Sequence, residues 1–151
     1  MRKLFFVLVL AATQSYAATT VYMDPATGAK GGILKATLHW NSPRPVSSTA
    51  MQFTITYNTE DFTNVSITPG GDITVPNKNL TCFPGKGTLS CVVWAINNAP
   101  IVVGYSLGTI NMEVSPTAHA TSTVYVTNPL GCSASGQIVV LMAGSAAMTL
   151  R

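Results

Sequence analysis

The residues that could do chemistry in this chain are few, and the most suggestive is a serine between glycines. Gly104-Tyr105-Ser106-Leu107-Gly108 matches the GxSxG pattern that presents a nucleophilic serine in α/β-hydrolases. In those enzymes the serine lies at a sharp turn between a strand and a helix. Here the motif precedes residues 109–115, in which polar and apolar residues alternate as in a strand. We therefore interpret the motif as a turn that enters a strand, and Ser106 as non-catalytic.

The acidic and histidine residues are too scattered to predict a catalytic or metal site. His39 and His119 lack the HExxH neighbourhood of a zinc enzyme, and we expect His39 to be solvated on the polar side of its strand. No carboxylate pair, EF-hand spacing or CxxC spacing is present. The residues predict a protein that is not an enzyme and that needs no cofactor or metal ion. The five acids are Asp24, Glu60, Asp61, Asp72 and Glu113.

The start of the chain has the pattern of a secretory signal peptide. A basic start and the apolar run 4–12 precede small residues at Ser15 and Ala17. The run is shorter than the roughly 20 residues that a membrane-spanning helix needs. We predict a signal peptide over residues 1–17, one mature domain over residues 18–151, and a secreted protein, extracellular or periplasmic, without a membrane anchor.

The rest of the chain carries little charge. Charged residues make up 9% of the sequence, and without the predicted signal peptide six basic residues stand against five acidic ones. A nucleic-acid-binding protein needs a basic patch that neutralises phosphates. The composition therefore argues against nucleic acid as a partner.

Three cysteines would meet an oxidising compartment in a secreted protein. Cys82 and Cys91 are separated by residues 83–90, which contain the turn-forming pair Pro84-Gly85 between strand-like residues. Such a turn can bring two thiols together, so we predict a disulfide between Cys82 and Cys91. The alternatives are pairing of either residue with Cys132, or three unpaired thiols. If Cys82 and Cys91 form the disulfide, Cys132 is left without a disulfide partner.

Period-two alternation of apolar and polar residues predicts strands along the whole chain. Residues 34–40, 51–57 and 109–115 alternate clearly, which places one face in a core and the other in solvent. The only helical signal is one turn at residues 59–62, which Thr59 could cap. The pattern predicts one all-β domain, a sandwich or jelly roll. Shorter strands are expected at 20–23, 65–68, 88–96, 121–127, 137–142 and 147–150, with breakers at 31–32, 42–45, 69–71, 97–100 and 128–131.

Two tryptophans are candidates for a binding surface as well as for the core. Trp40 shares its parity with Leu38, which favours the core. Trp94 lies in the run 92–96, Val-Val-Trp-Ala-Ile, which is apolar on both faces, so the sequence leaves its direction open. The other candidates for sugar stacking belong to separate elements: Tyr22, Tyr105 and Tyr125.

Several segments, in order along the chain, resemble the cohesin domain family. Residues 51–73, which run from Met51-Gln-Phe-Thr-Ile-Thr-Tyr57 to Pro69-Gly-Gly-Asp72-Ile73, resemble the family's strand, aromatic turn and "PGD" segment. Upstream, Ala29-Lys-Gly-Gly32 looks like the turn before the family's second strand. Downstream, residues 107–114, Leu-Gly-Thr-Ile-Asn-Met-Glu-Val, resemble the "G.LATI.F.V" strand. The cysteine segment and Asn97-Asn-Ala-Pro-Ile101 are similar to secreted bacterial cohesin-like proteins with a disulfide hairpin.

The resemblance implies a nine-stranded jelly-roll β-sandwich, related in fold to cellulose-binding module families 2 and 3. Cellulosomal cohesins bind dockerin modules of plant-wall-degrading enzymes with one sheet face, and they have no catalytic activity. The resemblance therefore implies a dockerin-like protein partner, in extracellular polysaccharide degradation or surface assembly.

Two hypotheses on binding follow. In the first, a protein partner binds the polar side of the strand at 51–57, which carries Gln52, Thr54 and Thr56, and we add Trp94 as a candidate binding residue. In the second, the domain is a carbohydrate-binding module that uses an exposed aromatic or polar strip on one sheet face.

Overall fold

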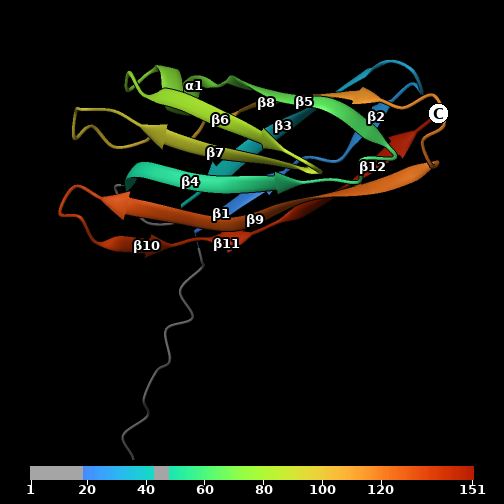
Figure 1. Cartoon of the computed structure of the whole chain (residues 1–151). Helices are drawn as coiled ribbons and strands as arrows, with labels where there is room; N and C mark the ends of the chain where they lie inside the picture. The colour runs from blue at the N-terminus through green and yellow to red at the C-terminus, as the bar shows by residue number, and fades with distance from the viewer. Residues whose placement is uncertain (1–18, 43–47) are drawn as a thin grey trace, which may run out of the picture.

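The alternating segments form the strands of two sheets that pack face to face (Figure 1). The computed structural model describes residues 19–42 and 48–151, so the predicted signal peptide lies outside the described residues. The strands are β1 Thr20–Met23, β2 Ala26–Gly28, β3 Ile33–Asn41, β4 Ser48–Thr56, β5 Phe62–Pro69, β6 Asn79–Gly85, β7 Thr88–Trp94, β8 Gly108–Val114, β9 Thr121–Ser133, β10 Ile138–Val140, β11 Met142–Ala143 and β12 Ser145–Leu150, and the short helix α1 is Gly71–Thr74.

One sheet has five strands and the other has seven. The five-stranded sheet has the order β11-β1-β3-β8-β5, and the seven-stranded sheet has the path β2-β12-β9-β4-β7-β6 with β10 beside β9. Alternation buries one side of β3, β7, β8, β12 and most of β4 and β9, and the two inward faces form one continuous core between the layers. The structure confirms the all-β sandwich and the core position of Trp40, which is 3% exposed. Other core residues include Leu34, Leu38, Phe53, Ile55, Phe62, Ile110, Met112, Val124 and Met148.

The number of strands and the course of β9 differ in detail from expectation. Nine strands have four residues or more, and the described chain adds three shorter ones, β2, β10 and β11. The expected breaker at 128–131 lies inside β9, because a bulge takes up the extra residues. Gln52 pairs with Leu130 and Thr54 with Thr127, and Asn128 between them has a φ of 50°.

The helical turn expected at residues 59–62 is a turn without a helix. The N–H groups of Asp61 and Phe62 both donate to the Asn58 carbonyl, at 3.2 and 3.0 Å. The Asn58 side chain, rather than Thr59, accepts the N–H of Glu60 at 3.0 Å. Helix α1 begins at Gly71, the last residue of the breaker expected at 69–71, and continues through Thr74 in a segment for which we expected no helix. Among residues 19–42 and 48–151 no helix is long and apolar enough to cross a membrane.

The disulfide between Cys82 and Cys91 is confirmed. The two residues face each other across the β6–β7 hairpin, and their Cα atoms are 4.1 Å apart. The hairpin turns at Lys86-Gly87 rather than at Pro84-Gly85, because β6 continues to Gly85 and Gly87 supplies the positive φ of 70°. Cys132 is a free, half-buried thiol.

Candidate binding face

Strand β4 presents the three polar residues of the first binding hypothesis. In β4 the alternate residues Met51, Phe53 and Ile55 are buried against the core, so Gln52, Thr54 and Thr56 lie on the outward side of the seven-stranded sheet. The Thr54 hydroxyl lies 3.1 Å from that of Ser90 on β7, and the Thr56 hydroxyl lies 3.2 Å from that of Thr127 on β9. These hydroxyls form a polar row along the middle of the sheet.

Trp94 lies on the same outward side, at the end of β7. Cys91 and Val93 are buried, whereas Val92 and Trp94 point outward, and Trp94 is 45% exposed. Its indole Nε1 donates a hydrogen bond of 3.1 Å to Thr81 Oγ1 on β6. The fold therefore places all four candidate binding residues on one face of one sheet.

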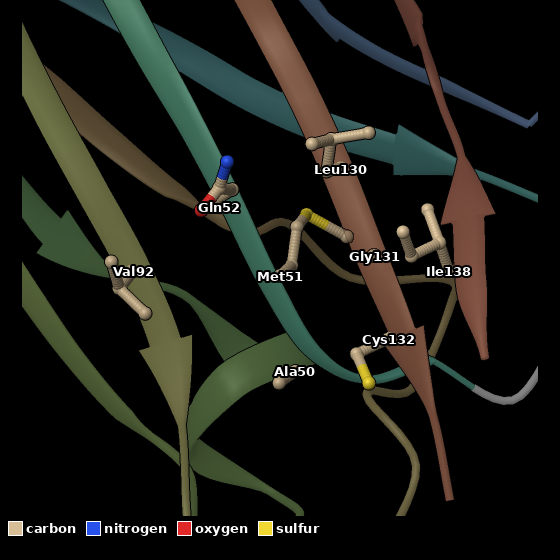
Figure 2. Close-up of a pocket in the computed structure, with 8 residues that line it drawn as sticks. All are labelled: Ala50, Met51, Gln52, Val92, Leu130, Gly131, Cys132 and Ile138. Atoms are coloured by element: carbon tan, nitrogen blue, oxygen red, sulfur yellow. The ribbon is translucent and has the colours of Figure 1, made fainter. Parts of the chain in front are cut away.

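A hollow of about 250 Å³ lies beside Gln52, where β4 passes between β7 and β9 (Figure 2). Cys132 and Leu130 on β9 and Ile138 on β10 form its far side. Sequence reasoning missed this hollow because it placed Leu130 in a breaker and gave the strand of Ile138 no partner. The lining residues are Ala50, Met51, Gln52, Val92, Leu130, Gly131, Cys132 and Ile138.

The seven-stranded sheet is free of charge along its described strands. β2, β4, β6, β7, β9, β10 and β12 contain no Asp, Glu, Lys, Arg or His. The outward side of the five-stranded sheet, in contrast, carries Lys35, His39 and Glu113. We refer to the outward side of β6, β7, β4, β9 and β10 as the neutral face. The strands of this face offer apolar contacts and neutral hydrogen bonds rather than ion pairs.

Comparison with known proteins assigns the chain to a family. The family described as "Cohesin domain" matches residues 19–144, which is most of the chain. The chain belongs to the cohesin family. No curated protein sequence matches this cohesin.

This cohesin shares its fold with solved cohesins at low sequence identity. A non-cellulosomal cohesin from the hyperthermophilic archaeon Archaeoglobus fulgidus matches it with a TM-score of 0.73 and 12% identity, over 89% of this chain and 92% of the other. A chain of the Coh-OlpA type I cohesin–dockerin complex from Clostridium thermocellum matches with a TM-score of 0.72 and 13% identity, over 87% and 99%. The seventh ScaB type I cohesin from Pseudobacteroides cellulosolvens matches with a TM-score of 0.70 and 15% identity, over 89% and 92%.

The surroundings of Ser106 do not resemble those of a hydrolase nucleophile. The GxSxG segment leads directly into strand β8, which begins at Gly108, as the alternation predicted. The Ser106 carbonyl accepts the N–H of Asp72 at 3.0 Å, so this loop lies against α1. Together with membership of the cohesin family, this supports a non-catalytic protein-binding module.

Sequence reasoning missed a buried carboxylate next to β5. Asp61 is 2% exposed and accepts hydrogen bonds from Asn58 Nδ2 (3.1 Å), Ser122 Oγ (2.7 Å), and the backbone N–H and Nδ1 of His119 (2.9 and 2.8 Å). Burial raises the pKa of Asp61, but the hydrogen bonds from His119 and Ser122 outweigh it and hold the pKa below its usual value. The carboxylate joins the β4–β5 turn to the segment that leads into β9.

Two other buried charged groups anchor the long loop between β7 and β8. Asp72 accepts the N–H of Tyr105 at 2.8 Å, and burial raises the pKa of this carboxyl. Lys78 donates from Nζ to Asn97 Oδ1 at 3.0 Å, and burial lowers the pKa of this amine. Both side chains bind loop atoms, which gives them a structural role.

His39 lies on the polar, outward side of β3 as expected, and its side chain is 25% exposed. Its ring stacks on Tyr22 with centroids 5.3 Å apart, and its Nε2 lies 2.8 Å from Asp24 Oδ2. These contacts belong to the outward side of the five-stranded sheet. Among the described residues, no group of three or more His, Cys, Asp or Glu side chains could hold a metal ion.

Proposed function

We propose that this cohesin is a secreted, non-catalytic module that binds a dockerin-like protein through the neutral face. The observation that carries the proposal is the placement of Gln52, Thr54, Thr56 and Trp94 together on that face, beside the apolar hollow. The pattern of residues 1–17 supports secretion. A role in polysaccharide degradation or surface assembly is part of the same proposal.

The composition of the neutral face suits a protein partner. Binding energy at protein interfaces is concentrated in a few central residues, among which tryptophan is enriched. Trp94 is an exposed residue of this kind, and the hollow can receive an apolar side chain of the partner. The hydroxyl row on β4 can form neutral hydrogen bonds. Complexes described as cohesin–dockerin complexes are among the structures that share this fold.

Carbohydrate binding is the competing function. A sugar platform needs aromatic rings in a row and polar groups that pair with hydroxyls. On the neutral face the exposed aromatic residues Phe83, Trp94 and Tyr125 lie on three different strands. The hollow, which extends over β4 from β7 to β10, is lined almost entirely by apolar atoms, which would leave sugar hydroxyls unpaired.

The test introduces one charge on each sheet in turn. Thr54→Glu places a carboxylate in the middle of the neutral face, and Thr37→Glu places one at a half-buried outward position of β3 on the other sheet. Each tagged protein is incubated with secreted proteins of the source organism and, separately, with insoluble cellulose and chitin. Captured proteins are identified by mass spectrometry and titrated by calorimetry.

A dockerin-like protein that binds the wild type and Thr37→Glu but not Thr54→Glu supports the proposal. Retention on cellulose or chitin that Thr54→Glu abolishes, with no protein captured, favours the carbohydrate-binding function instead. A partner that is lost only with Thr37→Glu would move the binding site to the five-stranded sheet.

A further inference from the structure

Apolar side chains on the neutral face are divided between its two edges. On the β6–β7 side, Phe83 and Trp94 project from the sheet and are 60% and 45% exposed. On the β9–β10 side, Ile138 and Val140 are 75% and 78% exposed, and Ile138 lines the hollow. The polar row of β4 separates these two groups. The face thus carries apolar projections on the β6–β7 side and an apolar recess that extends from Val92 on β7 across β4 to β9 and β10, with most of its lining on β4, β9 and β10.

The strand register places Trp94 level with the recess. Met51 pairs with Val93, so the next residue, Trp94, lies level with Ala50 across the sheet. Ala50 in turn pairs with Cys132 on β9, which lines the hollow. Trp94 therefore lies at the height of Ala50 and Cys132, and the β9 part of the hollow lies at that height on the other side of β4.

This arrangement is self-complementary under one symmetry operation. A two-fold axis that lies above the face and parallel to β4 exchanges the two sides of β4 and leaves the height along the strands unchanged. It therefore places β7 of one copy over β9 of the other, and Trp94 over the hollow. An isologous interface makes each such contact twice, which doubles the number of anchored tryptophans.

The absence of charge allows a second copy to occupy this face without repulsion. Near a two-fold axis each residue faces its own equivalent, so any charge there would meet a like charge. β4, which would lie along the axis, and its neighbours β7 and β9 contain no charged residue. A partner of opposite charge would gain nothing from this face, whereas an identical neutral face meets no repulsion.

We propose that the neutral face also binds a second copy of this chain, forming a symmetric dimer in which Trp94 of each copy fills the hollow of the other. The inference goes beyond the proposed function, because it concerns the purified chain alone and does not require a dockerin-like partner. Both interactions would use the same face, so the dimer would compete with partner binding.

The test measures self-association by sedimentation velocity over a dilution series. All proteins carry Cys132→Ser, so that no disulfide between copies contributes. Trp94→Ala removes the projection, and Ile138→Asp places a charge at the hollow. The matched control is Ile33→Asp, which replaces an isoleucine that is 63% exposed on the outward side of the five-stranded sheet. Thermal unfolding of each variant shows whether it is folded.

The expected result is a reversible dimer that both neutral-face variants weaken by about tenfold or more, and that Ile33→Asp leaves unchanged. Trp94 fluorescence should shift to the red on dilution, whereas the buried Trp40 contributes a constant signal. A protein that stays monomeric up to the highest soluble concentration would overturn the inference, and so would a dimer that is unaffected by Trp94→Ala and Ile138→Asp. Neither outcome affects the test of the dockerin-like partner, which uses Thr54→Glu.

Discussion

Asp61→Asn should destabilise the fold strongly, although it changes only one atom of the side chain. The amide keeps one acceptor oxygen but turns an NH₂ group toward the donors of Ser122, Asn58 or His119. Hydrogen bonds to a charged group contribute about 1.5–3 kcal/mol each, and buried donors that lose their acceptor carry a further desolvation cost. The His119 side chain is 64% exposed and can turn to water, so its share is small. We expect a loss of about 2–4 kcal/mol, a large part of the stability of about 5–15 kcal/mol typical of such a domain.

The pH dependence tests the reasoning more sharply than the loss itself. The folded-state pKa of Asp61 is lowered, so ionised Asp61 contributes stability that is fully present above the unfolded pKa of about 3.9. That contribution is lost as the pH falls through the folded-state pKa. Asparagine does not titrate. The difference in unfolding free energy between the wild type and Asp61→Asn should therefore be largest near neutral pH and shrink below about pH 4.

The assay is equilibrium denaturation followed by the fluorescence of the buried Trp40, at neutral pH and at the lowest pH where both proteins fold. The matched control is Asp24→Asn, which removes the carboxylate of the more exposed pair that Asp24 forms with His39. An exposed pair contributes at most about 1 kcal/mol. The reasoning is refuted if Asp61→Asn costs no more than Asp24→Asn, or if its cost is the same at both pH values.

Two further predictions follow from the hairpin and from the GxSxG loop. Replacing Cys82 and Cys91 together by alanine should lower the unfolding free energy by roughly 2–3 kcal/mol, because the disulfide closes a short loop in the unfolded chain. Equilibrium denaturation measures this loss, and an unchanged denaturation midpoint would contradict the prediction. Ser106→Ala should not change the rate of p-nitrophenyl ester hydrolysis relative to the wild type, because the GxSxG motif leads into β8 rather than into a helix. If the wild type hydrolysed the ester and the variant only matched the rate in buffer without protein, Ser106 would be catalytic.

The period-two pattern was sufficient to place Gln52, Thr54 and Thr56 on one face of β4, but it could not orient Trp94. The run around Trp94 is apolar at every position, so alternation gives no direction. In the structure Cys91 is buried, so alternation along β7 also turns Val93 inward and Trp94 outward. The disulfide between Cys82 and Cys91 fixes which residues of β6 and β7 face each other, but the buried side is selected by packing against the other sheet.

The features that sequence reasoning missed depend on contacts between distant segments. Three of the four hydrogen bonds to the Asp61 carboxylate come from His119 and Ser122, about 60 residues away in the sequence, and nothing in the neighbourhood of Asp61 marks it as buried. The hollow has the same origin, because β9 runs through an expected breaker by means of a bulge at Asn128 and then pairs with β10. Turn signals describe local preference, and pairing on both sides of a strand can outweigh them.

The neutral face connects the two proposals physically, because one surface cannot be covered twice. If the chain dimerises through Trp94 and the hollow, a partner must displace a second copy before it reaches β4. The apparent affinity for the partner then depends on the concentration of the chain, since only the monomer presents a free face. Partner titrations made well below the dimer dissociation constant report the intrinsic affinity, and those made above it report the difference between the two interactions. A sheet with no charged residue in its strands has no electrostatic means of choosing between these occupants, so the fit of side chains around Trp94 and the hollow decides which one binds.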